Sequence, residues 1–271
     1  MNEISCSPLI GKEYPCFIVA EAGINHGGEM KWAKELARAA KYAGADAVKF
    51  QTFLEKELGD KYPNISYYET LQLKEYCDEI GILFFSTPHS DSAIDLLSPI
   101  VPLMKIASTF FNKILFIDKV LQQEKPVIIS VNETVPLKDI SYLEELYMDR
   151  FNPPLYPLHT VCQYPAKDPM LEMLKERKEK YFVFDWGYSD HTKGYKNCVT
   201  AVRDYGACII EKHLKISDEC VDASHSILKH EFKEMVNEIR KMETATDATQ
   251  QADKVELGSV KSPKPATGTK R

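Results

Sequence analysis

The feature that most constrains the fold is a regular alternation between short apolar runs and segments with helical periodicity. Each run is rich in β-branched or aromatic residues, and an amphipathic stretch follows each one. This order is typical of a parallel sheet whose strands are joined by crossover helices. The predicted strands are residues 17–22, 47–51, 83–86, 103–107, 127–131, 157–161, 182–188 and 207–213.

The segments between these runs are predicted helices. The clearest is 29–43, in which four apolar residues share one face and Gly44 provides a stop signal. The others are 69–80, 92–97, 114–123, 136–149, 170–179, 193–205 and 231–242. Eight strand–helix pairs make a closed (β/α)8 barrel, the TIM barrel, and a chain of 271 residues accommodates one such domain of roughly 250 residues.

The composition of the chain changes after about Thr244. We expect residues 1–243 to form the barrel domain. Residues 244–271 are rich in Thr, Ala, Gln, Lys and Pro and show little apolar periodicity, so we expect a linker or disordered tail there.

Composition also restricts the partners and the compartment. A net charge of −6 argues against a general nucleic-acid binder. The seven cysteines form no CxxC pair, which favours reduced thiols. The first residues lack the pattern of a signal peptide, and no run approaches the length of a membrane span. We therefore expect a cytoplasmic protein with neither nucleic acid nor membrane as a partner.

Polar side chains end every predicted strand, where a barrel of this kind builds its active site. Lys49 and Lys105 lie on strands, and a buried charge needs a cavity or a partner. Together with several serine hydroxyls they predict an anion site for phosphate or carboxylate. The polar set at the strand ends includes Glu21, Gln51, Ser108, Ser130, Tyr164, Ser189 and Glu211.

Two histidines, His191 and His213, follow the last two predicted strands. If the barrel closes, both point into its mouth, where two imidazoles can hold a divalent metal completed by carboxylate or water. Taken singly, each could instead be a hydrogen-bonded structural residue. Glu211 could likewise form a buried ion pair with Lys212 or Lys49 instead of acting as a base.

Four other histidines are expected to lie outside this site. His26 and His89 are interpreted as loop residues. His225 and His230 follow the last predicted strand and are expected at the surface.

At these residues the chain resembles the sialic acid synthase family, which comprises the N-acetylneuraminate synthases and their relatives for legionaminic and pseudaminic acids. The resemblance runs from about Phe17 to Met242. Each motif alone is moderately specific, but all of them in order are highly specific. The motifs are residues 17–26, 44–51, 86–88, 105–108, 187–192 and 211–213.

The resemblance implies that phosphoenolpyruvate condenses with the open-chain form of an N-acylated hexosamine, giving a nine-carbon 2-keto acid and phosphate. It implies Mn2+ or Mg2+ held by His191 and His213, where the ion would polarise the sugar aldehyde. It also implies a homodimer.

The resemblance assigns roles to the strand-end residues. Glu21, Lys49, Glu211 and His191 are the expected catalytic residues, with Glu211 in proton transfer or electrostatic stabilisation. The expected substrate-binding residues are Gln51, Lys105, Ser108, Ser130, Tyr164, Ser189 and Asp222.

The chain departs from the family pattern in four places. Phe110 replaces a polar residue on the sugar side. Glu133 stands in a loop that meets phosphate through small residues, where it would repel an anion if it pointed inward. Ala223 aligns with a family histidine. The segment at 261–265 resembles the linker to the antifreeze-like domain that follows the barrel in the family, and the expectation is that this domain is absent here.

These departures leave two alternatives open. One is a related phosphoenolpyruvate condensation on a different acceptor aldehyde, which Phe110 and the altered Asp222 region favour. The other is a barrel that binds a sugar, an anion or a partner protein without turnover. The polar mouth argues against the second alternative, because a purely structural barrel gains nothing from it.

Overall fold

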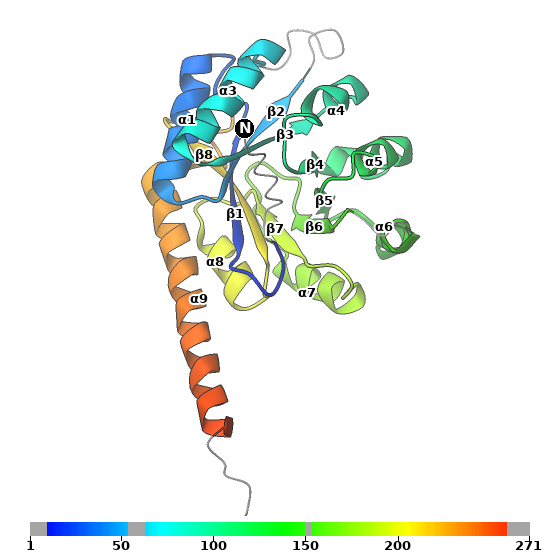
Figure 1. Ribbon diagram of the computed structural model, residues 1–271, viewed down its shortest axis with the longest axis vertical. Coiled ribbons are helices and arrows are strands. Elements are labelled where there is room, and N and C mark those ends of the chain that lie inside the picture. The colour runs from blue at the N-terminus through cyan, green and yellow to red at the C-terminus, as the bar shows by residue number, and fades with distance from the viewer. Residues whose placement is uncertain (1–9, 54–62, 150–152, 259–271) are drawn as a thin grey trace, which may run out of the picture.

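Eight parallel strands form the centre of the computed structural model, which describes residues 10–53, 63–149 and 153–258 (Figure 1). The strands are β1 (Phe17–Gly23), β2 (Ala47–Thr52), β3 (Leu83–Pro88), β4 (Met104–Ile106), β5 (Val127–Asn132), β6 (Leu155–Thr160), β7 (Gly187–Asp190) and β8 (Ile209–Lys215). Their hydrogen-bonded order is β3-β2-β1-β8-β7-β6-β5-β4, and β3 and β4 lie next to each other. The predicted TIM barrel is therefore confirmed.

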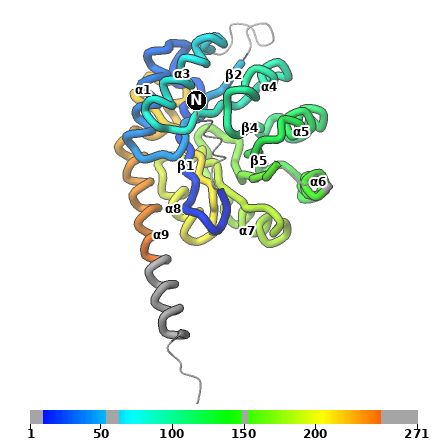
Figure 2. Tube along the Cα trace, viewed as in Figure 1, coloured from blue at the N-terminus to red at the C-terminus, as the bar shows by residue number. Residues whose placement is uncertain are grey.

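Helices surround the strands. They are α1 (Met30–Ala43), α3 (Tyr67–Ile80), α4 (Asp91–Leu97), α5 (Ile114–Leu121), α6 (Leu137–Asp149), α7 (Leu171–Lys180), α8 (Lys196–Arg203) and α9 (Lys229–Gly258), with a short 3-10 turn, η2 (Ser108–Phe110), after β4. Figure 2 traces the chain around the barrel, with α1 and α9 side by side where the circle closes. A two-residue strand, β9 (Ile227–Leu228), pairs with the end of β8.

Local sequence explains where the clearest helices begin and end. Helix α3 starts with a capping box, in which Ser66 and Glu69 satisfy each other's backbone N–H groups. Helix α1 ends at Gly44, whose φ of 84° is in the left-handed region that favours glycine. Gly44 is the stop signal predicted from the sequence.

Most predicted boundaries differ from the structure by a few residues, and two differ by five or more. The run 182–188 was expected to be strand, but β7 starts at Gly187; Phe184 and Trp186 are apolar because they are buried in the core ahead of the strand. The last helix was expected to end at Met242, but α9 continues to Gly258. Residues 244–258 hold Ala, Gln, Glu and Lys and no earlier glycine or proline, so helix propensity extends the helix without an apolar pattern. Residues 259–271 lie outside the described residues, and the domain division stays a prediction.

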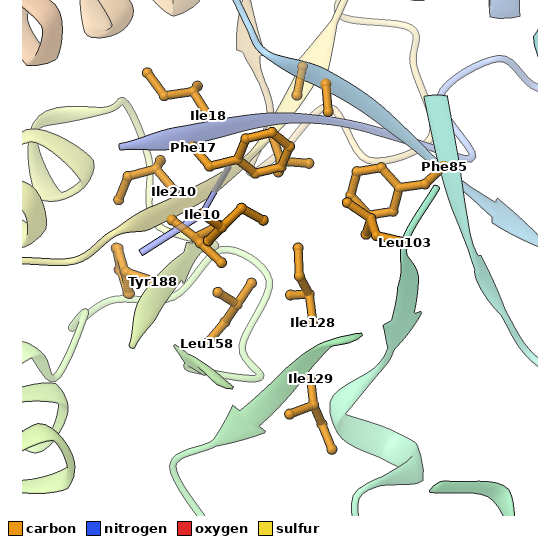
Figure 3. Packing of buried hydrophobic residues seen from close by; sticks show 14 of the residues in the cluster. Ile10, Phe17, Ile18, Phe85, Leu103, Ile128, Ile129, Leu158, Tyr188 and Ile210 are labelled. Carbon is orange, nitrogen blue, oxygen red and sulfur yellow. The ribbon is translucent and has the colours of Figure 1, made fainter. Parts of the chain in front are cut away.

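The apolar core lies below the mouth of the barrel. Because side chains alternate between the two faces of a strand, Phe17 and Val19 share the face of Glu21. Both are buried, as is Phe85, which is in register with Lys49. Figure 3 shows part of this core, with Ile10, Phe17, Ile18, Phe85, Leu103, Ile128, Ile129, Leu158, Tyr188 and Ile210 labelled. Polar residues replace apolar ones only toward the carboxyl ends of the strands.

Among the described residues, no helix has the length and apolar character needed to cross a bilayer. The cysteines described are free thiols, and most of them are buried.

Candidate active site

The side chains predicted from the sequence meet in one cavity of about 780 Å3. The cavity lies at the carboxyl ends of the strands, the end at which TIM barrels build active sites. The catalytic and binding roles of the individual side chains stay predictions. The predicted residues that line it are Glu21, Lys49, Gln51, Lys105, Ser108, Ser130, Tyr164, Ser189, His191, Glu211, His213 and Asp222.

The register of the sheet explains this convergence. Glu21 on β1 is in register with Lys49 on β2 and with His213 on β8. Ser189 on β7 is in register with Glu211 on β8. Residues in register on neighbouring parallel strands point to the same side of the sheet, so each set shares one level of the mouth.

Lys49 lies between two buried carboxylates. Its Nζ is 3.0 Å from Glu21 Oε2 and 3.5 Å from Glu211 Oε2, and it donates a hydrogen bond to Thr87 Oγ1 at 3.1 Å. Of the two ion pairs considered for Glu211, the one with Lys49 forms. Lys212 pairs with Asp190 instead.

The two carboxylates differ in their surroundings. Glu21 Oε1 accepts a hydrogen bond from Gln51 Nε2, and Glu211 Oε1 accepts one from Ser189 Oγ, each at 3.0 Å. Burial raises the pKa of Glu21 to about 7, although Lys49 opposes the shift. Burial acts on Glu211 in the same direction, but the nearby lysines and Ser189 together outweigh it and lower its pKa. The pair thus combines a fixed anion with a group able to exchange a proton near neutral pH.

Lys105 is a buried cation bonded only to neutral groups. It donates to Ser130 Oγ at 2.6 Å and to the Ile106 carbonyl at 3.1 Å. Among the described residues, no carboxylate lies within ion-pair distance of it. Burial lowers the pKa of Lys105 to about 8, so most of it is charged at neutral pH. An anionic ligand in the cavity would complete this arrangement.

The two predicted metal-binding histidines lie side by side, with ring centroids 5.5 Å apart. His191 Nδ1 lies 2.8 Å from the Val161 carbonyl, which leaves Nε2 for a ligand. His213 Nδ1 is buried, lies 3.6 Å from Asp222 Oδ2, and has no hydrogen-bond partner in the part of the chain that is described. Burial lowers the pKa of both histidines, so each presents a neutral nitrogen. Unpartnered imidazole nitrogens beside a carboxylate fit a divalent cation.

The prediction that His225 lies at the surface is wrong. It is buried, and its ring centroid is 4.4 Å from that of His213 and 5.8 Å from that of His191. Ligand atoms of His213, Asp222 and His225 lie within 4.8 Å of one another. The alignment had put Ala223 at the family histidine position, but the loop turns the histidine two residues further on into the site. The only signal for His225 in the sequence is its position three residues after Asp222.

The three other histidines that were expected outside the site lie in different environments. His230 is exposed, as expected. His26 is buried in the loop after β1 and does not line the cavity, whereas His89, after β3, does line it. His89 is the loop residue that sequence reasoning left out of the site.

An aromatic wall, defined here as Phe53, His89 and Phe110, forms another part of the cavity lining. The Phe53 and His89 rings are stacked with centroids 4.0 Å apart, and His89 meets Phe110 edge-on at 5.8 Å. Phe110, noted as a departure from the family pattern, therefore does face the site. The wall offers no carboxylate or amide to a ligand.

Glu133, a second departure, turns away from the cavity. Its Oε2 accepts a hydrogen bond from the Cys162 backbone N–H at 2.9 Å, and Glu133 is not among the residues that line the site. The repulsion of an anion considered from the sequence therefore does not arise. Instead, Glu133 ties the loop after β5 to the loop after β6.

Comparison with known proteins decides the family. Residues 61–251 match the sequence model of the NeuB family. The chain belongs to the NeuB family. N,N'-diacetyllegionaminic acid synthase of Legionella pneumophila is 33% identical, with 86% of this chain and 74% of that protein aligned. Pseudaminic acid synthase of Campylobacter jejuni is 34% identical, with 84% and 74% aligned.

A solved structure agrees. The N-acetylneuraminic acid (sialic acid) synthetase from Leptospira borgpetersenii, in complex with citrate, superposes with a TM-score of 0.83 at 30% identity, over 96% of this chain and 97% of that one. The resemblance stated from the motifs is thus confirmed, and this NeuB-family chain is a synthase. The sugar acids named for the three relatives differ from one another.

Proposed function

We propose that this NeuB-family synthase condenses phosphoenolpyruvate with the open-chain aldehyde of an N-acyl amino sugar similar to N-acetylmannosamine. The observation that carries the proposal is one cavity that holds both Lys105, a buried lysine with no carboxylate partner among the described residues, and an imidazole cluster around His213. The first suits an anionic substrate, and the second suits a metal that activates a carbonyl.

The proposed reaction balances with one water molecule. C3 of phosphoenolpyruvate forms a bond to the aldehyde carbon, and the aldehyde oxygen takes a proton to become a hydroxyl group. Water adds to C2, the bond from C2 to the phosphate oxygen breaks, and phosphate leaves. The product is a 2-keto acid that is three carbons longer than the sugar.

The anion site supplies the contacts to phosphoenolpyruvate. Lys105 Nζ donates a hydrogen bond to Ser130 Oγ at 2.6 Å, so the two side chains already lie together, and Lys49 adds a second cation. Ser108 and Ser189 add hydroxyl groups in the same cavity. Charge-assisted hydrogen bonds of this kind would hold the phosphate and carboxylate in one orientation.

The two carboxylates suit different steps. Glu211, whose pKa is lowered, would stabilise positive charge that develops at C2. Glu21, whose pKa is raised to about 7, would deliver the proton to the aldehyde oxygen. Gln51, hydrogen-bonded to Glu21, would orient it toward the acceptor.

The donor set fits a divalent cation, since His213 Nδ1 is a buried nitrogen without a hydrogen-bond partner among the described residues. His191 and His213 would hold Mn2+ or Mg2+, which supplies Lewis acidity toward the aldehyde. Tyr164, whose ring packs against His191 with centroids 4.4 Å apart, would shield this side of the site from water.

A second candidate is the same condensation on a different aldehyde acceptor. The aromatic wall supports it, because Phe110 cannot accept a hydrogen bond from a sugar hydroxyl. Homodimer formation and a cytoplasmic location remain expectations; sedimentation of the purified protein would measure the first.

The test is phosphate release from phosphoenolpyruvate in the presence of Mn2+, with and without N-acetylmannosamine. Release that needs the sugar and is lost in His213→Ala supports the proposal, and His230→Ala, at an exposed position, serves as the matched control. Release with another amino sugar only would favour the second candidate. Binding of phosphoenolpyruvate without release for any aldehyde would favour a barrel that binds without turnover.

A further inference from the structure

We infer that His225 is a third imidazole ligand of the metal, so that the site has three nitrogen donors and the Asp222 carboxylate and favours transition-metal ions over Mg2+. The inference rests on the proposed function for the presence of a metal. It adds a ligand that the sequence motifs do not predict, because the residue aligned with the family histidine is Ala223.

The spacing of the three rings fits one shared ion. A metal about 2.1 Å from an imidazole nitrogen lies about 3.3 Å from the ring centroid, so two rings on one ion have centroids about 4.5–6 Å apart at bond angles of about 90–130°. The observed separations are 4.4 Å for His213–His225, 5.5 Å for His191–His213 and 5.8 Å for His191–His225. The two longer separations lie within this range and the shortest is at its lower end, so the ring positions allow a single centre. The ligand atoms that lie within 4.8 Å of one another are those of His213, Asp222 and His225, so His191 completes the set only if its ring moves toward them.

The hydrogen bonds of the rings leave suitable nitrogens for the ion. His191 Nδ1 faces the Val161 carbonyl at 2.8 Å, and His225 Nδ1 faces Ser224 Oγ at 3.2 Å. A partner on one ring nitrogen orients the other toward a metal. His213 Nδ1 is buried without a hydrogen-bond partner in the described part of the chain, and Asp222 Oδ2 lies 3.6 Å from it.

The loop that carries His225 is held in place by four hydrogen bonds, two of them buried and two partly buried. Asn25, from the loop after β1, accepts a hydrogen bond from the Asp222 backbone N–H at 2.7 Å and donates to Ser226 Oγ at 3.1 Å and to the Leu214 carbonyl at 2.8 Å. Ser226 Oγ in turn donates to the Asp222 carbonyl at 2.6 Å. Asp222 and Ser226 flank His225, so its position is fixed before an ion binds.

The donor set determines which ions fit. Imidazole nitrogens suit Co2+, Ni2+ and Zn2+, and affinity rises along the series from Mn2+. Mg2+ takes oxygen ligands in a near-ideal octahedron and gives up its waters reluctantly. With His225 included, nitrogen donors outnumber the carboxylate three to one, so the site is a poor one for Mg2+.

The experiment measures metal binding directly on the whole chain, in the absence of substrates. Mn2+ affinity is followed by the electron paramagnetic resonance signal of the free ion, Co2+ by its visible absorption, and Mg2+ by competition with Mn2+. The variants are His225→Ala, His225→Asp and, as the matched exposed control, His230→Ala. His191→Ala and His213→Ala serve as references, and circular dichroism confirms that each variant is folded.

We expect His225→Ala to weaken Mn2+ and Co2+ binding at least about 10-fold and to alter the Co2+ spectrum, with His230→Ala unchanged. In His225→Asp an oxygen replaces a nitrogen, so the preference for Co2+ over Mg2+ should fall. If His225 only supported the loop and did not bind the ion, His225→Asp would leave the preference for Co2+ over Mg2+ unchanged.

Two results overturn the inference in distinguishable ways. If His191→Ala and His213→Ala lose the metal but both His225 variants bind all three ions like the unmodified protein, His225 is not a ligand and the proposed function stands. If none of the histidine variants changes binding, the metal assignment of the proposed function is wrong and the inference falls with it.

Discussion

Lys212 Nζ lies 3.0 Å from Asp190 Oδ2, and both side chains are completely buried beside the two strand-end histidines. Asp190 precedes His191 and Lys212 precedes His213 in the sequence. The Asp190 Oδ1 atom also accepts the Thr192 N–H at 2.8 Å, and Lys212 donates to the Thr192 carbonyl at 2.6 Å. This ion pair joins β7 to β8 behind the site, and it sets the positions from which both histidines reach the cavity.

We therefore expect Lys212→Met to destabilise the protein by about 3–5 kcal/mol, because it leaves Asp190 buried without its counter-charge. Urea denaturation measures the change. Arg203→Ala removes one partner of the exposed Arg203–Asp204 pair and should leave the midpoint unchanged. If the urea midpoints of Lys212→Met and Arg203→Ala were equal, the Lys212–Asp190 pair would not stabilise the folded protein.

The sequence was sufficient to predict the barrel and most of the site for one physical reason. Strand periodicity identifies strand ends, and in a closed parallel barrel all carboxyl ends meet. Glu21, Lys49 and His213 could therefore be placed together without any long-range information.

The features that were missed depend on contacts between distant residues. The inward turn of His225 depends on Asn25, a residue from the other end of the chain. The sequence leaves the partner of Glu211 open between Lys49 and Lys212. Lys212 follows Glu211 directly on β8 and so points to the opposite face of the strand, which leaves Lys49 on β2 as the partner. The start of β7 was misplaced because Phe184 and Trp186 are buried without belonging to a strand.

The affinity for phosphoenolpyruvate should fall as pH rises through about 8. Burial lowers the pKa of Lys105 to about 8, so the free protein loses this charge well below the pH at which an exposed lysine would. Below about pH 8, Lys105 is charged and can bind the phosphoenolpyruvate anion. Above that pH, Lys105 must take up a proton when phosphoenolpyruvate binds, which weakens the affinity. Calorimetric titration with phosphoenolpyruvate between pH 7 and pH 9 measures the trend.

The control for this dependence is Lys105→Met, which has no charge at any pH. It should bind phosphoenolpyruvate weakly and without the decline near pH 8. A decline of the same size in the variant would mean that another group binds the anion.

Glu21 should account for a separate pH dependence, in catalysis. Its pKa is raised to about 7 by burial, and its proposed role needs the protonated form, so kcat/KM should decline as pH rises through about 7. Glu21→Gln cannot lose a proton, and it should lower kcat about 10²–10⁴-fold while removing this decline. A pH–rate profile at saturating acceptor measures both effects.

The matched variant is Glu211→Gln, at a carboxylate whose pKa is lowered and which stays ionised across this range. It should lower kcat but keep the decline near pH 7. If Glu211→Gln removed the decline and Glu21→Gln kept it, the roles assigned to the two carboxylates would have to be exchanged.

The aromatic wall should set the choice of acceptor. Phe110 is buried, lines the cavity and contacts His89, so it offers an apolar surface where the family pattern has a polar group. We expect the protein to prefer an N-acyl amino sugar that carries an additional methyl group over N-acetylmannosamine. One methyl group in an apolar pocket changes kcat/KM by about 10–200-fold.

Phe110→Asn should reduce that preference by about 10-fold or more, because the amide replaces apolar contact with hydrogen-bonding capacity. The ratio of kcat/KM for the two sugars, measured by phosphate release, is the readout. KM for phosphoenolpyruvate should stay unchanged, because Lys105 and Ser130, the proposed contacts to the anion, are not part of the aromatic wall. A variant with an unaltered sugar ratio would show that the acceptor does not contact the aromatic wall, whereas a raised KM for phosphoenolpyruvate would place the wall against the anion instead.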